Sequence, residues 1–148
     1  MDKSSGFYTL KGYQLNTQIE LTTAMEDYLE MIYRITLANN RIKVSDLSKR
    51  LHVKPSSVTK MLQQLNHVEY IKTEKYGDIT ITEKGRRMGE YLLYRHDVIH
   101  RFLCILNHSE NELEQVEKIE HFLDEKTVRN IDLIIEKLKK ENLNSQPK

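Results

Sequence analysis

Residues 44–85 read VSDLSKRLHVKPSSVTKMLQQLNHVEYIKTEKYGDITITEKG, and this part of the chain indicates its fold most clearly. Its beginning, VSDLSKRLHV, predicts a short amphipathic helix, with Ser45 as the N-cap just before an acidic Asp46. Pro55 disfavours helix in the residue before it and suits the first turn of a second helix, which we expect to reach residue 70. Two short helices joined by a tight turn predict a helix-turn-helix.

A β-hairpin is expected directly after the second helix. Ile71 to Lys75 and Asp78 to Thr82 have the composition of two strands around a turn. A helix-turn-helix followed by a hairpin is a winged helix, which contacts DNA through its second helix and its wing, although the same fold also serves protein contacts. The candidate DNA-contacting residues are Lys54, Ser56, Ser57, Thr59, Lys60, Gln63, Lys72, Lys75 and Tyr76.

Charge is distributed unevenly along the chain. The net charge of the whole chain is +1, but residues 41–87 carry 11 Lys and Arg against 5 Asp and Glu. Residues 1–40 carry 3 against 5, and residues 88–148 carry 9 against 12. A local positive surplus is the electrostatic feature expected of a nucleic-acid-binding segment, and a solvated helix face is the plainer explanation.

Two acidic clusters lie about ninety residues apart: MEDYLE, at 25–30, and VEKIEH, at 116–121. Asp27 and Glu30 are three positions apart, while Glu117, Glu120 and His121 fall at i, i+3 and i+4. On a helix such residues share one face, where like charges repel unless a cation offsets them. Carboxylates with imidazole can hold a divalent metal ion.

Each cluster also has a plainer explanation. Asp27 and Glu30 are favourable near a helix N-terminus because of the helix dipole, with Thr22 or Thr23 as the cap. Glu117 and Glu120 are equally compatible with a solvated helix face. The presence of both clusters around a winged helix favours a metal-sensing DNA-binding protein.

The composition is that of one compact domain, or of two small domains that share a core. No apolar run approaches the roughly 18 residues of a membrane span, and the N-terminus has no signal-peptide pattern. Cys104 is the single cysteine, so an intrachain disulfide is excluded and a reducing cytoplasm is expected.

Three helices are expected after the hairpin. The first covers Glu83 to Asn107, with Thr82 and Glu83 at its start, and the last covers Lys126 to Leu143. Between them, Glu110 to Leu123 predicts a helix, because Ser109 and Glu112 resemble a capping box. These helices carry more apolar surface than one small core needs.

The motifs MEDYLEMIY, VSDLSKRLHVKPSSVTKMLQQL, LLYRHDVIHRFL and VEKIEH occur in the order and spacing of a known family. In these motifs the chain resembles the diphtheria-toxin-repressor superfamily, in particular its manganese-transport-regulator branch. The resemblance runs from about Thr22 to Leu143. It implies a mainly α fold: an N-terminal winged helix-turn-helix with a small β-hairpin wing, and a C-terminal helical metal-binding and dimerisation domain.

The resemblance also implies a set of metal ligands. In that branch two Mn²⁺ ions per chain would be held by Asp27, Glu30, His96, Glu117, Glu120 and His121. Asp27 and His96 would hold one ion, Glu30 and His121 the other, and Glu117 and Glu120 would contribute to both. The iron-responsive branch has Met and Cys at the positions of Asp27 and Glu120, whereas carboxylate oxygens suit Mn²⁺ better, although other divalent ions are not excluded.

The implied domains are a DNA-binding domain over 22–87 and a metal-binding and dimerisation domain over 88–143. Residues 144–148 are expected to be a disordered tail. For residues 1–21 the sequence leaves open a disordered arm, a DNA-contacting arm and a vector-derived tail. The chain ends after the dimerisation helices, so we expect no SH3-like third domain. The implied partners are a double-stranded DNA operator and a second copy in a two-fold homodimer.

Two other function classes stay open at this point. One is a winged-helix regulator that responds to a small organic effector. The other is a dinuclear metal enzyme, since carboxylate-bridged ions activate water. Against an enzyme, the run Glu117 to His121 is EKIEH, which is neither a zincin nor an inverzincin motif, and no nucleophile is evident. We therefore predict a metal-dependent regulator, most simply a repressor of manganese-uptake genes, and not an enzyme.

Overall fold

A computed structural model describes residues 9–15, 20–38, 41–74 and 78–145. The elements, in chain order, are α1 (Leu10–Leu15), α2 (Thr23–Leu37), α3 (Val44–Leu51), α4 (Pro55–His67), β1 (Ile71–Thr73), β2 (Ile79–Ile81), α5 (Glu83–Asn107), α6 (Leu113–Ile119), the 3₁₀ helix η2 (Glu120–Phe122) and α7 (Glu125–Ser145). Over these described residues the chain is mainly α with one two-stranded antiparallel hairpin, which confirms the predicted fold class.

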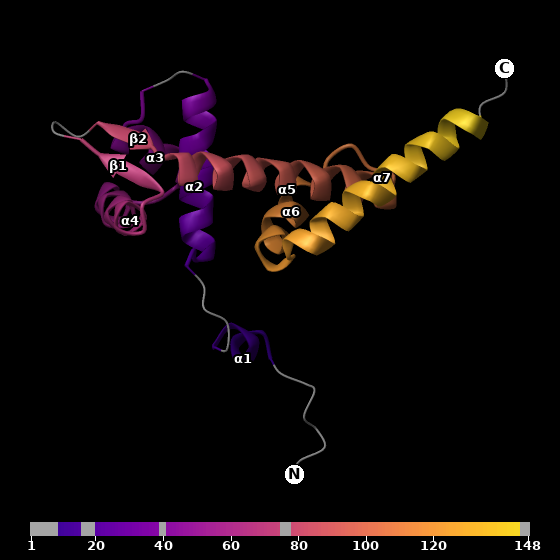
Figure 1. Ribbon diagram of the computed structural model, residues 1–148, viewed down its shortest axis with the longest axis horizontal. Coiled ribbons are helices and arrows are strands. Elements are labelled where there is room, and N and C mark those ends of the chain that lie inside the picture. The colour runs from indigo at the N-terminus through magenta and orange to yellow at the C-terminus, as the bar shows by residue number, and fades with distance from the viewer. Residues whose placement is uncertain (1–8, 16–19, 39–40, 75–77, 146–148) are drawn as a thin grey trace, which may run out of the picture.

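The winged helix is built from α2, α3, α4 and the hairpin (Figure 1). Ile71 pairs with Ile81, and Thr73 with Ile79, so both strands are shorter than predicted. The predicted N-cap at Ser45 is wrong: α3 begins at Val44 after Lys43, and no side chain caps it. Its C-terminal end also comes earlier, because His52 adopts a left-handed conformation with φ 54°.

Two clusters of buried apolar side chains hold the molecule together. The first cluster lies in the winged helix, around Leu29, Ile32, Leu47, Leu65 and Ile71. The second joins α5 to α6 and α7 and consists of Val98, Ile99, Leu103, Val116, Val128 and Ile135. Leu92 of α5 belongs to the first cluster, so one helix takes part in both cores.

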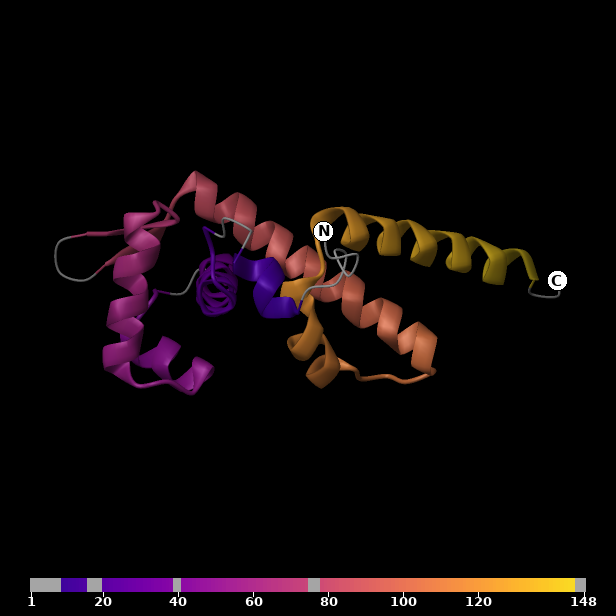
Figure 2. The ribbon, with the colours of Figure 1, turned by 90° about the horizontal axis from the view of Figure 1, so that it is seen from below.

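Helix α5 is the element that connects the two halves. It begins beside the wing, crosses α2 and ends among the C-terminal helices (Figures 1 and 2). Its bounds match the prediction, because the Thr82 hydroxyl caps it by accepting the Gly85 N–H at 3.0 Å. A continuous helix of 25 residues places His96 about midway between the two cores.

The segment after α5 differs from the prediction. Ser109 Oγ does donate to Glu112 Oε1, at 2.7 Å, but α6 begins only at Leu113, so the two residues do not form a capping box. The Glu112 N–H donates instead to His100 Nε2 of α5, at 3.2 Å. This tertiary bond ties the loop to α5 and delays the start of the helix.

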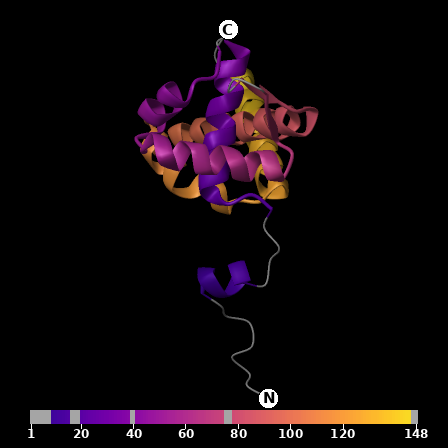
Figure 3. The ribbon, with the colours of Figure 1, turned by 90° about the vertical axis from the view of Figure 1, so that its left-hand side faces the viewer.

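At the C-terminal end the structure differs from the prediction, and at the N-terminal end it adds a short helix. Helix α7 continues through Ser145, so Asn144 and Ser145 are helical where a tail was predicted, and residues 146–148 lie outside the described part. Within the N-terminal extension, Leu10–Leu15 form α1, which lies beyond the N-terminal end of α2 (Figure 3). Among the described residues, no helix is long and apolar enough to cross a membrane.

Gly85 allows α5 to pass close to the hairpin. A Cβ atom there would overlap the Tyr70 carbonyl oxygen, which accepts the Thr82 N–H at 3.1 Å and cannot easily move. We expect Gly85→Ala to destabilise the fold by about 1–3 kcal/mol, despite the better helix propensity of alanine. Chemical denaturation measures this change, with the exposed neighbour Arg86→Ala as the control. A stability equal to the control would contradict this packing.

Candidate metal centre and DNA-binding surface

Glu120 is the centre of the candidate site. Although it is a carboxylate, it is only 1% exposed. Its Oε2 lies 3.0 Å from Nδ1 of His96 on α5, and its Oε1 lies 3.9 Å from Nε2 of His121. Glu120 and His121 belong to η2, whose tighter 3₁₀ geometry separates successive side chains by about 120° and lets the two residues face different helices.

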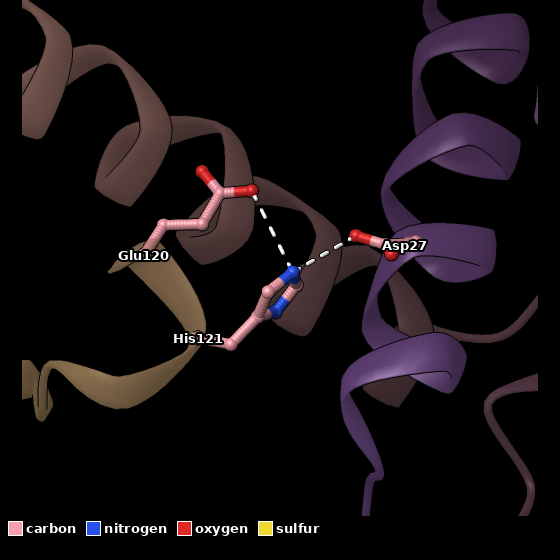
Figure 4. Close-up of side chains that lie close together, drawn as sticks. All are labelled: Asp27, Glu120 and His121. Atoms are coloured by element: carbon pink, nitrogen blue, oxygen red, sulfur yellow. Dashed lines mark ion pairs between the residues drawn. The ribbon is translucent and has the colours of Figure 1, made fainter. Parts of the chain in front are cut away.

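Two groups of potential ligand atoms share Glu120. Asp27, Glu120 and His121 offer atoms that all lie within 4.8 Å of one another, and so do Glu30, His96 and Glu120. In Figure 4, Asp27 of α2 and Glu120 both point toward the His121 ring. The site therefore combines α2 of the winged helix with α5 and η2 of the C-terminal half.

The grouping differs from the one implied by the resemblance. There, Asp27 accompanies His96 and Glu30 accompanies His121. In the structure, the imidazole of His121 pairs with Asp27, with 3.0 Å between Nε2 and Oδ1. Glu30 belongs to the same group of potential ligands as His96. All six predicted residues lie in one region, but Glu117 enters neither group. Its Oε1 is 3.7 Å from His96 Nδ1, and its side chain is half-exposed.

The electrostatics are those of crowded negative charge. Burial and the nearby Glu120 raise the pKa of Glu30 to about 7. Burial, and then Glu120, also raises the pKa of Glu117. Hydrogen bonds to Asp27 and Glu26 raise the pKa of His121 to about 10, and the hydrogen bond to Glu120 raises the pKa of His96. The clustered carboxylates therefore stabilise any positively charged group that lies between them.

The donor set fits a divalent cation. Carboxylate oxygens and imidazole nitrogens are usable ligands for first-row divalent metals, and no thiolate is among them. A carboxylate as buried as Glu120 needs compensating positive charge, which His96 and His121 provide only when protonated. A bound cation would supply that charge directly.

Two charged neighbours of the site were missed by the sequence analysis. Glu26 Oε1 lies 2.9 Å from His121 Nδ1, and Arg95 Nη1 lies 3.2 Å from Glu26 Oε2. A signal for Arg95 was present, since it falls on the buried stripe of α5, three residues after Leu92 and four before Ile99. The sequence held no comparable sign that Glu26 lies at the site, because acidic residues are common in the first turn of a helix.

The predicted DNA-contacting residues that the structure describes all lie on the surface. Pro55 is the first residue of α4, and the side chains that flank its buried stripe are exposed: Lys54, Ser56, Ser57, Thr59, Lys60 and Gln63. Lys72 is exposed on β1. Lys75 and Tyr76 lie outside the described residues. The exposed face of α4 is therefore polar and basic, as a helix in the major groove requires.

A cavity of about 620 Å³ lies next to the candidate site, the kind of space that a small organic effector would need. It is lined by Leu10 and Tyr13 of α1 and by Phe122, together with Glu26, Arg95 and His121. The cavity thus shares His121 with the candidate metal centre, and on geometry alone the effector alternative stays open.

A winged helix joined to a helical half that gathers carboxylates and imidazoles defines a class of metal-responsive DNA-binding regulators. Residues 20–79 match the family of the iron dependent repressor N-terminal DNA binding domain, and residues 82–146 match the iron dependent repressor metal binding and dimerisation domain. The chain belongs to the iron dependent repressor family. It is a metal-dependent DNA-binding transcriptional regulator and not an enzyme.

Individual relatives agree with this assignment. The HTH-type transcriptional regulator MntR of Geobacillus kaustophilus (strain HTA426) is 45% identical over 103 residues, which cover 69% of this chain and 73% of that protein. The manganese regulator SloR has a TM-score of 0.68 at 23% identity, over 76% of this chain and 53% of its own. That likeness concerns the fold.

The metal-dependent transcriptional regulator MtsR has a TM-score of 0.69 at 26% identity, over 78% of this chain and 55% of its own. The chain thus spans about half the length of these two solved structures. The comparisons favour the metal-dependent regulator over the effector-binding alternative.

Proposed function

We propose that this protein is a Mn²⁺-dependent repressor of manganese-uptake genes. The observation that carries the proposal is the buried carboxylate of Glu120, shared between two ligand groups that join α2 to α5 and η2. The proposed ligands are Asp27, Glu30, His96, Glu117, Glu120 and His121. Two ions per chain are proposed because the groups are distinct and only Glu120 belongs to both.

The choice of manganese rests on the donors. Every candidate ligand atom is a carboxylate oxygen or an imidazole nitrogen, and such donors suit Mn²⁺ better than a thiolate or thioether would. A relative at 45% identity is named MntR. Iron and zinc are the competing ions, since selectivity depends on geometry and metal availability as well as on donors.

The proposed mechanism is thermodynamic linkage between the metal centre and DNA. Bound divalent cations supply positive charge that offsets the clustered carboxylates. Asp27 and Glu30 are then held against the half of the protein that bears His96, Glu120 and His121. Because α2 packs in the winged-helix core, this fixes the direction of α4, and a coupling of about 1–3 kcal/mol between metal and DNA is typical of such systems.

A two-fold homodimer is proposed as the DNA-binding species. Leu133 of α7 is 62% exposed, and Ile134 beside it is also exposed. These exposed side chains leave an apolar surface on α7 that is open to a second copy. Helix α7 also extends past the end of α5 (Figure 1). Two α4 helices would then enter successive major grooves about 34 Å apart.

The remaining assignments follow from this function. We propose 22–87 as the DNA-binding domain and 88–143 as the metal-binding and dimerisation domain. A regulator of transcription acts where the DNA is, so a cytoplasmic location is proposed. The roles of Lys54, Ser56, Ser57, Thr59, Lys60, Gln63, Lys72, Lys75 and Tyr76 in DNA contact are part of the same proposal.

The deciding experiment is a Mn²⁺ titration of metal-stripped protein, followed by the EPR signal of free Mn²⁺. We expect saturation at about two ions per chain. A duplex selected by the protein from a random library in Mn²⁺ then serves as the DNA probe. Its affinity should fall about 5–150-fold when a chelator is added, which is the typical size of an allosteric coupling.

Two results would count against the proposal. The absence of saturable Mn²⁺ binding would make the acidic clusters ordinary helix faces. DNA affinity that is unchanged in chelator would favour an organic effector in the cavity beside His121. Parallel titrations with Fe²⁺ under anaerobic conditions and with Zn²⁺ give the order of metal preference.

A further inference from the structure

A buried ion-pair network lies behind His121, on the side of the ring away from Asp27 and Glu120. Glu26 Oε1 is 2.9 Å from His121 Nδ1, and Glu26 Oε2 is 3.2 Å from Arg95 Nη1. Arg95 is only 4% exposed. The three side chains come from η2, α2 and α5, so the network crosses the same three elements as the candidate metal centre.

The donor and acceptor chemistry determines which nitrogen of His121 carries a proton. An ionised carboxylate only accepts hydrogen bonds, so Nδ1 of His121 must be protonated and donate to Glu26. Arg95 Nη2 is also 3.3 Å from Nδ1, but a guanidinium only donates and therefore cannot take that proton. Without a metal ion, Nε2 also donates, to Asp27 Oδ1 at 3.0 Å. A metal ion would displace the proton on Nε2, while the proton on Nδ1 stays with Glu26, so Nε2 is the nitrogen available to the metal.

Glu26 is not a member of either ligand group, and its contacts explain why. Its Oε1 is engaged by His121 and its Oε2 by Arg95. One residue along an α-helix turns the side chain by about 100°, so Glu26 faces Arg95 while the adjacent Asp27 faces Nε2 of His121. The positive charge of Arg95 holds Glu26 in that direction.

Packing alone does not account for the burial of Arg95. Its Nε is buried without a hydrogen-bond partner, which is unfavourable. Leu92 and Ile99 on the same stripe of α5 are apolar, and an apolar residue between them would avoid this penalty. The burial of Arg95 is explained if its guanidinium serves to hold the Glu26 carboxylate in position.

We propose that Glu26 and Arg95 are positioning residues for His121, fixing its tautomer and ring direction so that Nε2 faces the metal ion. Histidine ligands generally donate their second N–H to a carboxylate or carbonyl, and loss of such a partner typically costs about 10–100-fold in metal affinity. Glu26 acts directly on the ring, and Arg95 acts through Glu26. The inference rests on the proposed function, in which His121 is a ligand.

The test compares Glu26→Gln with the wild-type protein in the Mn²⁺ titration. We expect one of the two ions to bind about 10–100-fold more weakly, with the number of ions at saturation unchanged. Glu26→Asp retains a carboxylate and should recover part of the affinity. Glu114→Gln removes an exposed acid of α6, paired with Lys118, and is the matched control.

A second readout does not need metal. In protein labelled with ¹⁵N-histidine, the Nδ1–H proton of His121 should give a downfield signal, assigned by its loss in His121→Ala. The signal should move upfield in Glu26→Gln, because a neutral amide is a weaker acceptor than a carboxylate. A residue that only supports the fold would change thermal stability and leave this signal in place.

Three outcomes overturn the inference. Mn²⁺ affinity in Glu26→Gln equal to that of the Glu114→Gln control is one. The loss of one ion per chain at saturation is another, because Glu26 would then be a ligand. A proton found on His121 Nε2 but not on Nδ1 is the third. If the wild-type protein itself binds no Mn²⁺, the proposed function fails, and the histidine spectrum still shows whether Nδ1 of His121 carries a proton bonded to Glu26.

Discussion

Glu120→Ala is expected to abolish the metal dependence of DNA binding. Glu120 is the one residue common to both ligand groups, so a single substitution should weaken both sites. The DNA affinity of the variant in saturating Mn²⁺ should equal its affinity in chelator. Relative to the wild-type protein in Mn²⁺, this is a loss of about 5–150-fold. Fluorescence anisotropy with the selected duplex measures both affinities, and EPR counts the bound Mn²⁺.

Folding must be controlled in this experiment, because Glu120 is buried beside two imidazoles. Glu120→Gln keeps the shape of the side chain and removes only its charge, so it should show the same loss of Mn²⁺ with less effect on packing. Glu114→Ala, on the exposed face of α6, should behave as the wild-type protein. If the Mn²⁺ response survives in folded Glu120→Ala, the assignment of the site is wrong.

Lys60→Glu is expected to have the opposite pattern, with DNA binding lost and Mn²⁺ binding retained. Lys60 is exposed on α4, far along the chain from every candidate ligand. Each phosphate contact contributes a factor of about ten near 0.1 M salt, and a dimer presents two copies of the residue. Lys60→Ala should therefore weaken binding about a hundredfold, and charge reversal should weaken it further through repulsion from the phosphates.

The salt dependence of binding separates this effect from unfolding. Lys60→Ala should reduce the slope of log affinity against log salt by about 1 for each protomer. Lys139→Glu reverses a charge on the exposed side of α7 and is the control. A variant of Lys60 that binds DNA normally but loses Mn²⁺ would reverse the roles proposed for the two halves of the protein.

Local signals in the sequence were sufficient for much of the fold. The apolar period and the Thr82 cap predicted the bounds of α5, because both act within a few residues of the helix start. The hairpin was found in the right place, although its strands are shorter than expected. The N-cap at Ser45 and the capping box at Ser109 were wrong. The capping box fails because the backbone N–H of Glu112 donates to His100 of α5 instead. Such a tertiary hydrogen bond cannot be predicted from a local sequence pattern.

The candidate ligands were likewise found from residue type, spacing and family resemblance, but their arrangement was not. Helical spacing brings Asp27 near Glu30, and Glu117 near Glu120. It says nothing about which imidazole lies beside which acid. The pairing of His121 with Asp27 depends on the 3₁₀ turn at Glu120 and on how α2 crosses α5. The contribution of Arg95 and Glu26 depends on the same crossing.

The class of this protein could be predicted from its sequence, which indicates a winged helix, a helical second half and a set of oxygen and nitrogen donors. These features follow from periodicity, capping and residue chemistry, which act over short stretches of chain. Two features could be seen only once the helices were packed together: Glu120 is buried and belongs to both ligand groups, and a buried arginine lies behind His121. Both are consequences of packing between residues that lie 24 to 95 positions apart in the chain, where the geometry of the crossing helices selects the contacts.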